Sequence, residues 1–266
     1  MSKLQRAIHE IYRFEDIAQR SQWVNRIHPL AKFVLTVAYI ALTVSFSKYD
    51  IIGLLGMAVY PFVMFQLAEL SVRESLYRLR LVLPIVLVVG ICNPFFDHTV
   101  LSIGGITVWG GVISMLTLML KGIFSLLASY LLIATTTIEQ LCYAFRMLHI
   151  PKILVTQILL TYRYITVLLE EVSRITQAYQ LRAPNQNGIH FKAWGSLTGQ
   201  LLLRSIDRAN TVYESMLLRG YDADFSYVGE HRRICAQDMI YFIVWMLLLV
   251  MLRKIPVILW IGGLFV

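Results

Sequence analysis

Two arginines close two long helical segments of this chain, and their chemistry is the easiest to define. Residues 152–182 and 196–221 carry apolar residues at three- and four-residue steps, which is typical of amphipathic helices. The first segment contains Arg182 at its end and the second contains Arg219, 37 positions later. Arginine stays charged and presents several N–H donors in a rigid fork, so it suits binding to a partner's carboxylates or carbonyls. Both arginines are therefore candidate docking residues; the alternative is that each caps its own helix end on a wet surface.

A second constellation, E-E-x-x-R, lies on the first of these segments at Glu170, Glu171 and Arg174. It resembles the E-E-x-x-x-R motif of intramembrane CAAX-type proteases, but it is one residue short and no supporting histidine motif follows. Glu170 and Arg174 are spaced for an ordinary ion pair along a helix. Arg163 precedes Glu170 by seven residues and lies on the same helix face. We interpret Arg163, Glu170 and Arg174 as a structural ion-pair stripe that braces the helix to a neighbour, and an intramembrane enzyme stays open as an alternative.

Motifs for other chemistries are absent from the sequence. It contains no H-E-x-x-H zinc motif, no G-x-S-x-G nucleophile elbow and no Walker lysine loop for ATP. None of the six histidines has another histidine three or four residues away, and the three cysteines show neither metal-ligand spacing nor a disulfide pattern. The sequence therefore predicts no catalytic residue, no metal site and no cofactor in this chain.

The composition is that of an integral membrane protein. Of the 266 residues, 58% are hydrophobic and only 15% are charged, whereas soluble domains usually carry about a quarter charged residues. The net charge is +8, and the basic residues gather in loops without interleaved aromatic residues. This distribution favours a role in membrane orientation over nucleic-acid binding. The first 29 residues hold no short apolar core before a cleavage site, so no cleavable signal is expected.

The apolar runs divide the chain into a cytoplasmic N-terminal tail, a four-span membrane region, a charge-rich cytoplasmic region with the two long helices, and a C-terminal membrane segment. These regions are residues 1–29, 30–137, 138–233 and 234–266. The expected spans of the second region are residues 30–46, 51–68, 81–96 and 108–137. Pro84 and Pro94 should kink or end the third span.

Basic side chains indicate the orientation of the spans. The tail and the loop at residues 69–80 hold eight Lys and Arg residues, while the opposite loops hold one, Lys48. The positive-inside rule therefore places the N-terminus in the cytoplasm and returns the chain there after the fourth span. Lys121 lies inside the fourth span, and Arg253 and Lys254 interrupt the last apolar segment. Those last two cations would lie outside if that segment crosses once, which is against the rule.

Taken together, several stretches resemble one family, the transmembrane T component of energy-coupling-factor (ECF) importers, which is the scaffold of vitamin- or metal-uptake ABC transporters. The likeness lies in HPLAK at 28–32, NPFFD at 93–97, LLTYRY at 159–164, and the arginine endings QLRAP at 180–184 and LLRGYD at 217–222. The layout, HPLAK and NPFFD look most like the cobalt-type branch, CbiQ.

The resemblance implies that the arginine endings belong to coupling helices that dock into grooves on two cytoplasmic ATPase subunits. The residues that match the docking signatures by position are Arg182, Ala183, Arg219 and Gly220. Leu181 and Leu218 depart from the small residue that precedes the arginine in the family's signature. Gly220 is also expected to take the left-handed conformation that ends many helices. The implied partners are two ABC-type ATPases that bind the ATP, a substrate-binding membrane (S) subunit and the lipid bilayer, and no nucleic acid.

We therefore expect an all-α integral membrane protein with a bundle of about five or six transmembrane helices and long amphipathic cytoplasmic coupling helices. Its expected role is that of a non-catalytic, multi-pass scaffold in the plasma membrane of a prokaryote, serving cobalt uptake. A T component shared among vitamin-binding subunits stays open, and so does nickel or a vitamin as the substrate. A stand-alone secondary transporter would favour acidic residues at mid-membrane, and the four expected spans contain none.

Overall fold

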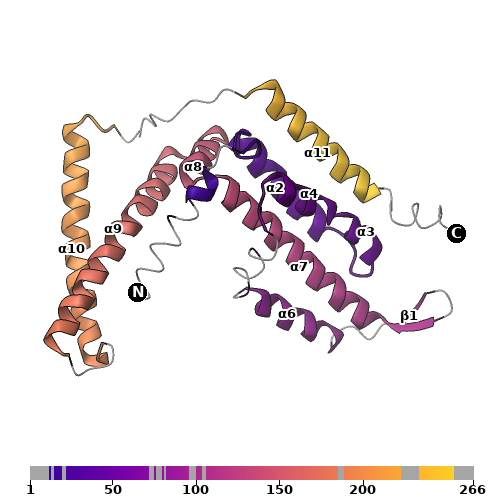
Figure 1. Ribbon diagram of the computed structural model, residues 1–266, viewed down its shortest axis with the longest axis horizontal. Helices are drawn as coiled ribbons and strands as arrows, with labels where there is room; N and C mark the ends of the chain where they lie inside the picture. Colours follow the sequence, from indigo (N-terminus) through magenta and orange to yellow (C-terminus); the bar gives the residue numbers. More distant parts are fainter. Residues whose placement is uncertain are drawn as a thin grey trace. The chain divides into compact units, whose positions relative to one another are not determined.

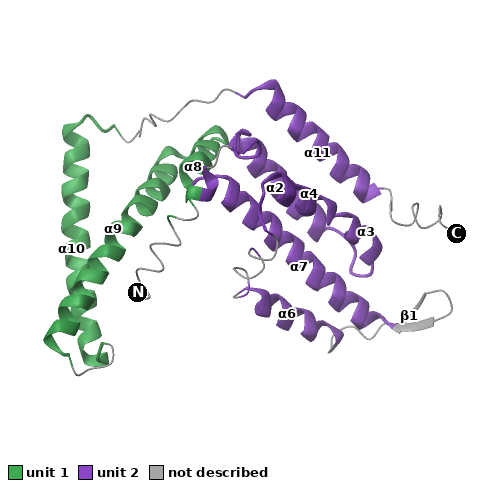
Figure 2. Cartoon of the chain, viewed as in Figure 1, with its two compact units in different colours: residues 1–16, 138–231 green, residues 17–137, 232–266 purple. Residues whose placement is uncertain are grey.

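The computed structural model of the chain describes residues 12, 15–19, 22–71, 75, 80, 82–95, 100–103, 106–184, 189–222 and 234–254. The chain divides into two compact units, which are coloured separately in Figure 2: unit 1 is residues 1–16 and 138–231, and unit 2 is residues 17–137 and 232–266. Among the described residues the elements are helices, apart from one short β-hairpin (Figure 1).

Unit 2 is built around the long helix α7 (Gly110–Thr135). This helix packs against α2 (Pro29–Val44), α3 (Ile51–Gly56), α4 (Val59–Leu67) and α6 (Leu83–Cys92), and α11 (Ala236–Lys254) packs against α2 and α3. Buried aromatic rings join three of these helices. Tyr60 of α4 lies with its ring centroid 4.6 Å from that of Tyr39 in α2 and 5.0 Å from that of Trp245 in α11.

The second expected span, residues 51–68, is two helices and not one, because of a proline. Pro61 has no N–H to donate to the carbonyl of Met57, four residues earlier, so a continuous helix would leave that carbonyl without its usual donor. The Tyr39 hydroxyl donates to the Met57 carbonyl at 3.0 Å instead, and α3 and α4 meet at this point. The apolar segment predicted as the second span is therefore broken near its middle.

The third expected span is a short helix held tightly to α7. Pro84 lies in the first turn of α6, and the helix passes into the 3-10 turn η2 (Asn93–Phe95) at Pro94, so both prolines mark ends as predicted. A side chain at Gly122 would meet Val86 at 2.4 Å, and one at Gly90 would meet Met119 at 2.7 Å. These glycines let the two helices approach closely, as small residues do in membrane helix pairs.

A β-hairpin precedes α7 where the sequence predicted only a loop and the start of a span. Strands β1 (Val100–Ile103) and β2 (Ile106–Trp109) are antiparallel, with Val100 opposite Trp109 and Ile103 opposite Ile106. The helix starts only at Gly110. The hairpin is a small addition to the expected all-α fold, since all other described elements are helices.

Cations from two other helices bind the C-terminal end of α2. The Lys121 ammonium of α7 donates to the carbonyls of Val44 and Phe46 at 3.0 and 2.5 Å. The Arg253 guanidinium of α11 donates to the carbonyl of Leu42 at 3.0 Å and lies 4.9 Å from the centre of the Phe46 ring. The last carbonyls of a helix lack partners within it and favour positive charge, so both cations have a structural role.

Arg253 and Lys254, the cations that interrupt the last apolar segment of the sequence, belong to a helix. Both residues lie in the last turn of α11, which is continuous from Ala236 to Lys254. The expected continuation at residues 255–266 lies outside the described residues.

Unit 1 holds α8 (Ile138–Met147) and the two long helices α9 (Lys152–Arg182) and α10 (Phe191–Leu218). The structure places α9 at the bounds that the sequence predicts, whereas α10 begins five residues earlier than residue 196. The side chain of His190 caps this earlier start by accepting a hydrogen bond from the Lys192 N–H at 3.4 Å.

By length and composition alone, three of the described helices could cross a membrane: α7, α9 and α11. The other apolar helices of the described part, namely α2, the pair α3–α4 and α6, are shorter. The first half of α9 is thus as apolar as a membrane span, although the sequence places it in the cytoplasmic region. The finding supports a membrane protein and leaves the number of crossings as a prediction.

Candidate functional site

Helix α9 ends at Arg182, the first candidate docking residue, and the residue that follows it is not in the left-handed conformation. Arg182 is the last helical residue and is exposed, and the Ala183 N–H donates to the Tyr179 carbonyl at 3.1 Å. Ala183 has a φ of −133°, and Pro184 then prevents the helix from continuing. The arginine is thereby held at the C-terminal end of the helix dipole, where positive charge is favoured.

The second candidate end, at Arg219, closes α10 with a Schellman turn. The Tyr221 N–H donates to the Met216 carbonyl at 3.0 Å, and the Gly220 N–H donates to the Leu217 carbonyl at 2.9 Å. Gly220 has a φ of +79°, which confirms the left-handed conformation predicted for it. Arg219 is the residue that caps the helix and is exposed. The two endings therefore share an arginine but not a backbone geometry.

A leucine precedes each arginine and is almost fully exposed. Leu181 is 83% exposed and Leu218 is 89% exposed. In the sequence both leucines stood out only as departures from the family's signature, although a leucine beside an arginine at each of two helix ends was the signal available. Arginine is enriched among the residues that dominate binding energy at protein interfaces, and an exposed leucine beside it adds apolar surface that a partner can bury.

The two ends lie at opposite ends of an antiparallel helix pair within unit 1. The start of α9 and the second half of α10 line one groove together, so the helices run in opposite directions (Figure 1). With 28 residues, α10 is about 42 Å long at 1.5 Å per residue. Arg182 and Arg219 are thus separated by roughly the length of a helix, about 40 Å.

Two ion pairs involve the acidic residues that the sequence analysis singled out. Glu170 and Arg174 form the expected pair along α9, with their charged atoms 4.0 Å apart and both side chains exposed. Glu171 is bound to Arg204 of α10, which makes this pair the brace between the two helices. The predicted brace through the Arg163–Glu170–Arg174 stripe is therefore provided by the neighbouring glutamate. Among the described residues no ion pair to Arg163 is found.

The groove between α9 and α10 has a volume of about 430 Å³ and is mainly apolar. Its lining is Ile153, Thr156, Gln157, Leu160, Thr161, Tyr164, Leu168, Ser205, Arg208, Ala209, Val212, Tyr213, Met216 and Tyr221. It belongs to the half of the hairpin that carries Arg219, because it reaches from Ser205 to Tyr221 along α10. It gives the hairpin an apolar surface in addition to its two charged ends.

The described part of the chain holds no group of three or more His, Cys, Asp or Glu side chains placed to bind a metal ion. Cys142 of α8 is buried, and Cys92 and Cys235 are exposed. Burial raises the pKa of the Cys142 thiol, and the Glu139 carboxylate raises it further. This thiol therefore stays protonated, unlike the thiolate of a reactive or metal-binding cysteine.

Comparison with known proteins identifies the family. The family model described as cobalt transport protein, CbiQ, matches residues 20–227. The cobalt transport protein CbiQ of Salmonella typhimurium is 25% identical over 226 residues, which cover 79% of this chain and 96% of that protein. An uncharacterized protein of Methanocaldococcus jannaschii is 35% identical over 105 residues, and the match spans 39% of this chain and 38% of that protein. The chain belongs to the CbiQ cobalt transport protein family, the membrane proteins that its arginine endings and its HPLAK motif resemble.

Proposed function

We propose that this protein is the transmembrane scaffold and energy-coupling subunit of an ECF-type cobalt importer. It links two cytoplasmic ABC-type ATPases, which bind the ATP, to a substrate-binding S subunit in the membrane, and it has no catalytic activity of its own. One observation carries the proposal: two exposed Leu–Arg pairs, Leu181–Arg182 and Leu218–Arg219, lie at opposite ends of one helix hairpin.

Each Leu–Arg pair combines two kinds of contact that suit a groove on an ATPase. Full burial of an exposed leucine contributes about 1.5–3 kcal/mol to binding. The guanidinium makes charged hydrogen bonds with carboxylates or carbonyls, and removing one side of such a contact costs about 2–5 kcal/mol. The ends are about 40 Å apart, so each would meet a different ATPase subunit. The hairpin therefore connects the two ATPases as one rigid element.

The helices of unit 2 support a membrane-embedded scaffold with a cytoplasmic N-terminus. Lys32, in the second turn from the start of α2, donates to the carbonyl of Thr135 at the end of α7, and the His28 N–H donates to Asp238 at the start of α11. The starts of α2 and α11 thus lie together with the end of α7, and this end faces the cytoplasm. Lys121 and Arg253 then lie at the outer end, where their bonds to α2 carbonyls offset the cost of placing them against the positive-inside rule.

The ion pairs of the E-E-x-x-R constellation favour a scaffold over a membrane enzyme. Glu170 and Glu171 each face an arginine, Arg174 and Arg204, so both carboxylates have structural partners. A general acid or base in a membrane protease would instead lie beside its substrate. A Glu170→Gln, Glu171→Gln double variant that transports cobalt supports the scaffold, and loss of transport with intact assembly supports the enzyme.

Reconstitution of the purified subunits tests the proposed function. Proteoliposomes with this chain, the S subunit and both ATPases should take up Co²⁺ only when ATP is supplied on the ATPase side. Uptake by this chain alone, or uptake without the ATPases, would contradict the scaffold. Uptake of a vitamin in place of Co²⁺ by the same assembly would keep the scaffold and correct the substrate.

A further inference from the structure

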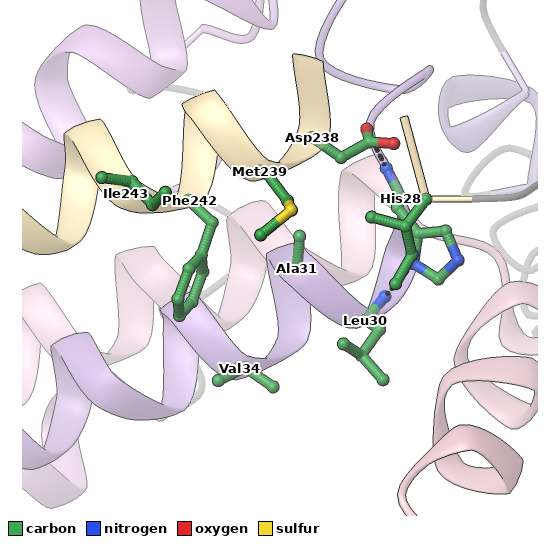
Figure 3. A pocket seen from close by; sticks show the side chains of 9 residues that line it. His28, Leu30, Ala31, Val34, Asp238, Met239, Phe242 and Ile243 are labelled. Carbon is green, nitrogen blue, oxygen red and sulfur yellow. Dashed lines mark hydrogen bonds between the residues drawn. The ribbon is translucent and has the colours of Figure 1, made fainter. Parts of the chain in front are cut away.

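Three buried polar residues of unit 2 lie where α2, α7 and α11 meet. His28 and Lys32 belong to the start of α2, and Asp238 belongs to the first turn of α11. Their exposed fractions are 0%, 3% and 2%. Figure 3 shows His28 and Asp238 bordering the small apolar pocket between α2 and α11, which has a volume of about 150 Å³. Burial of a charged group is unfavourable unless hydrogen bonds or opposite charges compensate it, so the partners of these side chains explain why they can be buried.

The carboxylate of Asp238 joins the first residues of two helices. One of its oxygens accepts the N–H of His28 at 2.9 Å, and the other accepts the N–H of Cys235 at 2.9 Å (Figure 3 draws the first bond). His28 precedes α2 and Cys235 precedes α11, and the first N–H groups of a helix have no partner within it. A negative charge is favoured beside helix N-termini. The carboxylate is therefore bound by two helix starts at once.

The ammonium of Lys32 adds the third helix. Its Nζ donates to the carbonyl of Thr135, the last residue of α7, at 2.6 Å. Positive charge is favoured at a helix C-terminus for the same reason that negative charge is favoured at an N-terminus. His28, Lys32 and Asp238 thus tie two helix starts and one helix end together, and we call these three residues the three-helix anchor.

Along the sequence, all three crossings of the chain between its two units are close to residues of this anchor or their contacts. The boundaries between the two units lie after Asp16, after Thr137 and after His231. The anchor residues and their contacts at His28, Thr135 and Asp238 follow or precede these boundaries by 12 residues or fewer. Every covalent connection from α8, α9 and α10 to the bundle of unit 2 therefore arrives at helix ends that the anchor holds.

We propose that the three-helix anchor transmits movement of the α9–α10 hairpin to the membrane bundle of unit 2. This inference rests on the proposed function, because it assigns the point at which the energy-coupling movement enters the membrane. If α2, α7 and α11 are tied at one point, a force on any of the three connections moves the three helix ends together. Without the ties, the same force displaces one helix end and is lost to local rearrangement.

The chain offers matched controls at the opposite end of the same bundle. Lys121 donates to the Phe46 carbonyl at 2.5 Å, as Lys32 does to Thr135, but away from the crossings. Asp50 accepts the N–H of Gly53 at 2.9 Å at the start of α3, as Asp238 does at the starts of α2 and α11. Lys121→Met removes the same kind of contact as Lys32→Met, and Asp50→Asn makes the same neutralising change at a helix start as Asp238→Asn, both without touching the anchor.

The test measures Co²⁺ transported per ATP hydrolysed in purified complexes that contain both ATPases. In Lys32→Met and Asp238→Asn complexes we expect ATP hydrolysis to continue and transport per ATP to fall by about fivefold or more, the range of ordinary coupling between sites. The Lys121→Met and Asp50→Asn complexes should keep the wild-type ratio even where their melting temperatures fall. An unchanged ratio in both anchor variants would overturn the proposal, whereas a wild-type chain that binds no ATPase would overturn the proposed function instead.

A second measurement on the wild-type complex decides the matter if the anchor variants do not accumulate. The amide hydrogens of His28 and Cys235 are bound by Asp238, so both should exchange slowly with deuterium, with and without ATP. Fast exchange of either amide in either state would mean that the ties open, and the three helix ends would then not move as one. Slow exchange in both states supports the anchor.

Discussion

Gly220 provides the sharpest test of the helix end that we assign to docking. Its φ of +79° costs an L-residue about 1–2 kcal/mol. A Cβ added at this position would meet no atom within 4 Å, so no clash adds to that conformational cost. Gly220→Ala should therefore shift the Schellman turn toward an open form by a factor of about 5–30. Because the turn sets where Leu218 and Arg219 point, the affinity of the assembled scaffold for its ATPase should fall by up to the same factor.

The matched control is Gly199→Ala, on the same helix. Gly199 is inside α10, and a Cβ there also meets no atom within 4 Å. Alanine should stabilise the helix by about 0.5–1 kcal/mol and leave the ATPase affinity unchanged. The assay is a binding titration of detergent-purified protein with each ATPase. Wild-type affinity in Gly220→Ala, or the same loss in both variants, would refute the assignment of this turn to docking.

Three further predictions concern the rest of the chain. A charge swap that combines Glu171→Arg with Arg204→Glu should restore the free energy of unfolding that either single change lowers by about 0.5 kcal/mol; a swap no better than the single changes would mean that the pair does not brace the hairpin. Thr99 and Gln186 are not among the described residues. A cysteine reporter at Thr99 should be labelled from the external side of the membrane, and one at Gln186 only from the cytoplasm. Labelling of Gln186 from the external side would mean that α9 crosses the membrane. The folded-state pKa of Cys142 is raised above its ordinary 9.0, so the unfolded thiol ionises first and the free energy of unfolding should fall as pH rises through 9.0. In denaturant titrations between pH 8 and pH 10, Cys142→Ser should reduce that fall, and an equal fall in both proteins would contradict the assignment.

The sequence predicted the helices that local patterns define. Residues 152–182 form α9 at the expected bounds, because Pro151 precedes the apolar repeat and Pro184 follows it. The left-handed turn at Gly220 was also predictable, since glycine after an arginine-capped helix is a strong local signal. The start of α10 was predicted too late. The helix was expected to begin with the apolar repeat, and the capping side chain of His190 was not considered.

Features that depend on contacts between distant segments were not predictable from the pattern alone. The break between α3 and α4 could have been found at Pro61, but the Tyr39 hydroxyl that replaces the missing bond comes from another helix. The structural role of Arg253 was not predictable, because hydropathy does not show that an α2 carbonyl binds it. The partner of Arg204 was not predictable either, because only the fold places Glu171 beside it. Sequence periodicity describes the faces of a single helix, whereas the contacts of these residues join two helices.

Reversal of both arginine charges tests the central claim most directly. Arg182→Glu and Arg219→Glu should each weaken binding of the ATPases, because each places like charge against groups that accept the arginine's hydrogen bonds. Arg163→Glu is the matched control, since it makes the same charge change on an exposed residue of α9 away from both helix ends. The measurement is co-purification of the two ATPases with the double variant, alongside its Co²⁺ uptake. We predict that the double variant inserts normally and retains neither ATPase binding nor uptake, while Arg163→Glu keeps both; a double variant that co-purifies with both ATPases and transports at the wild-type rate would contradict the account.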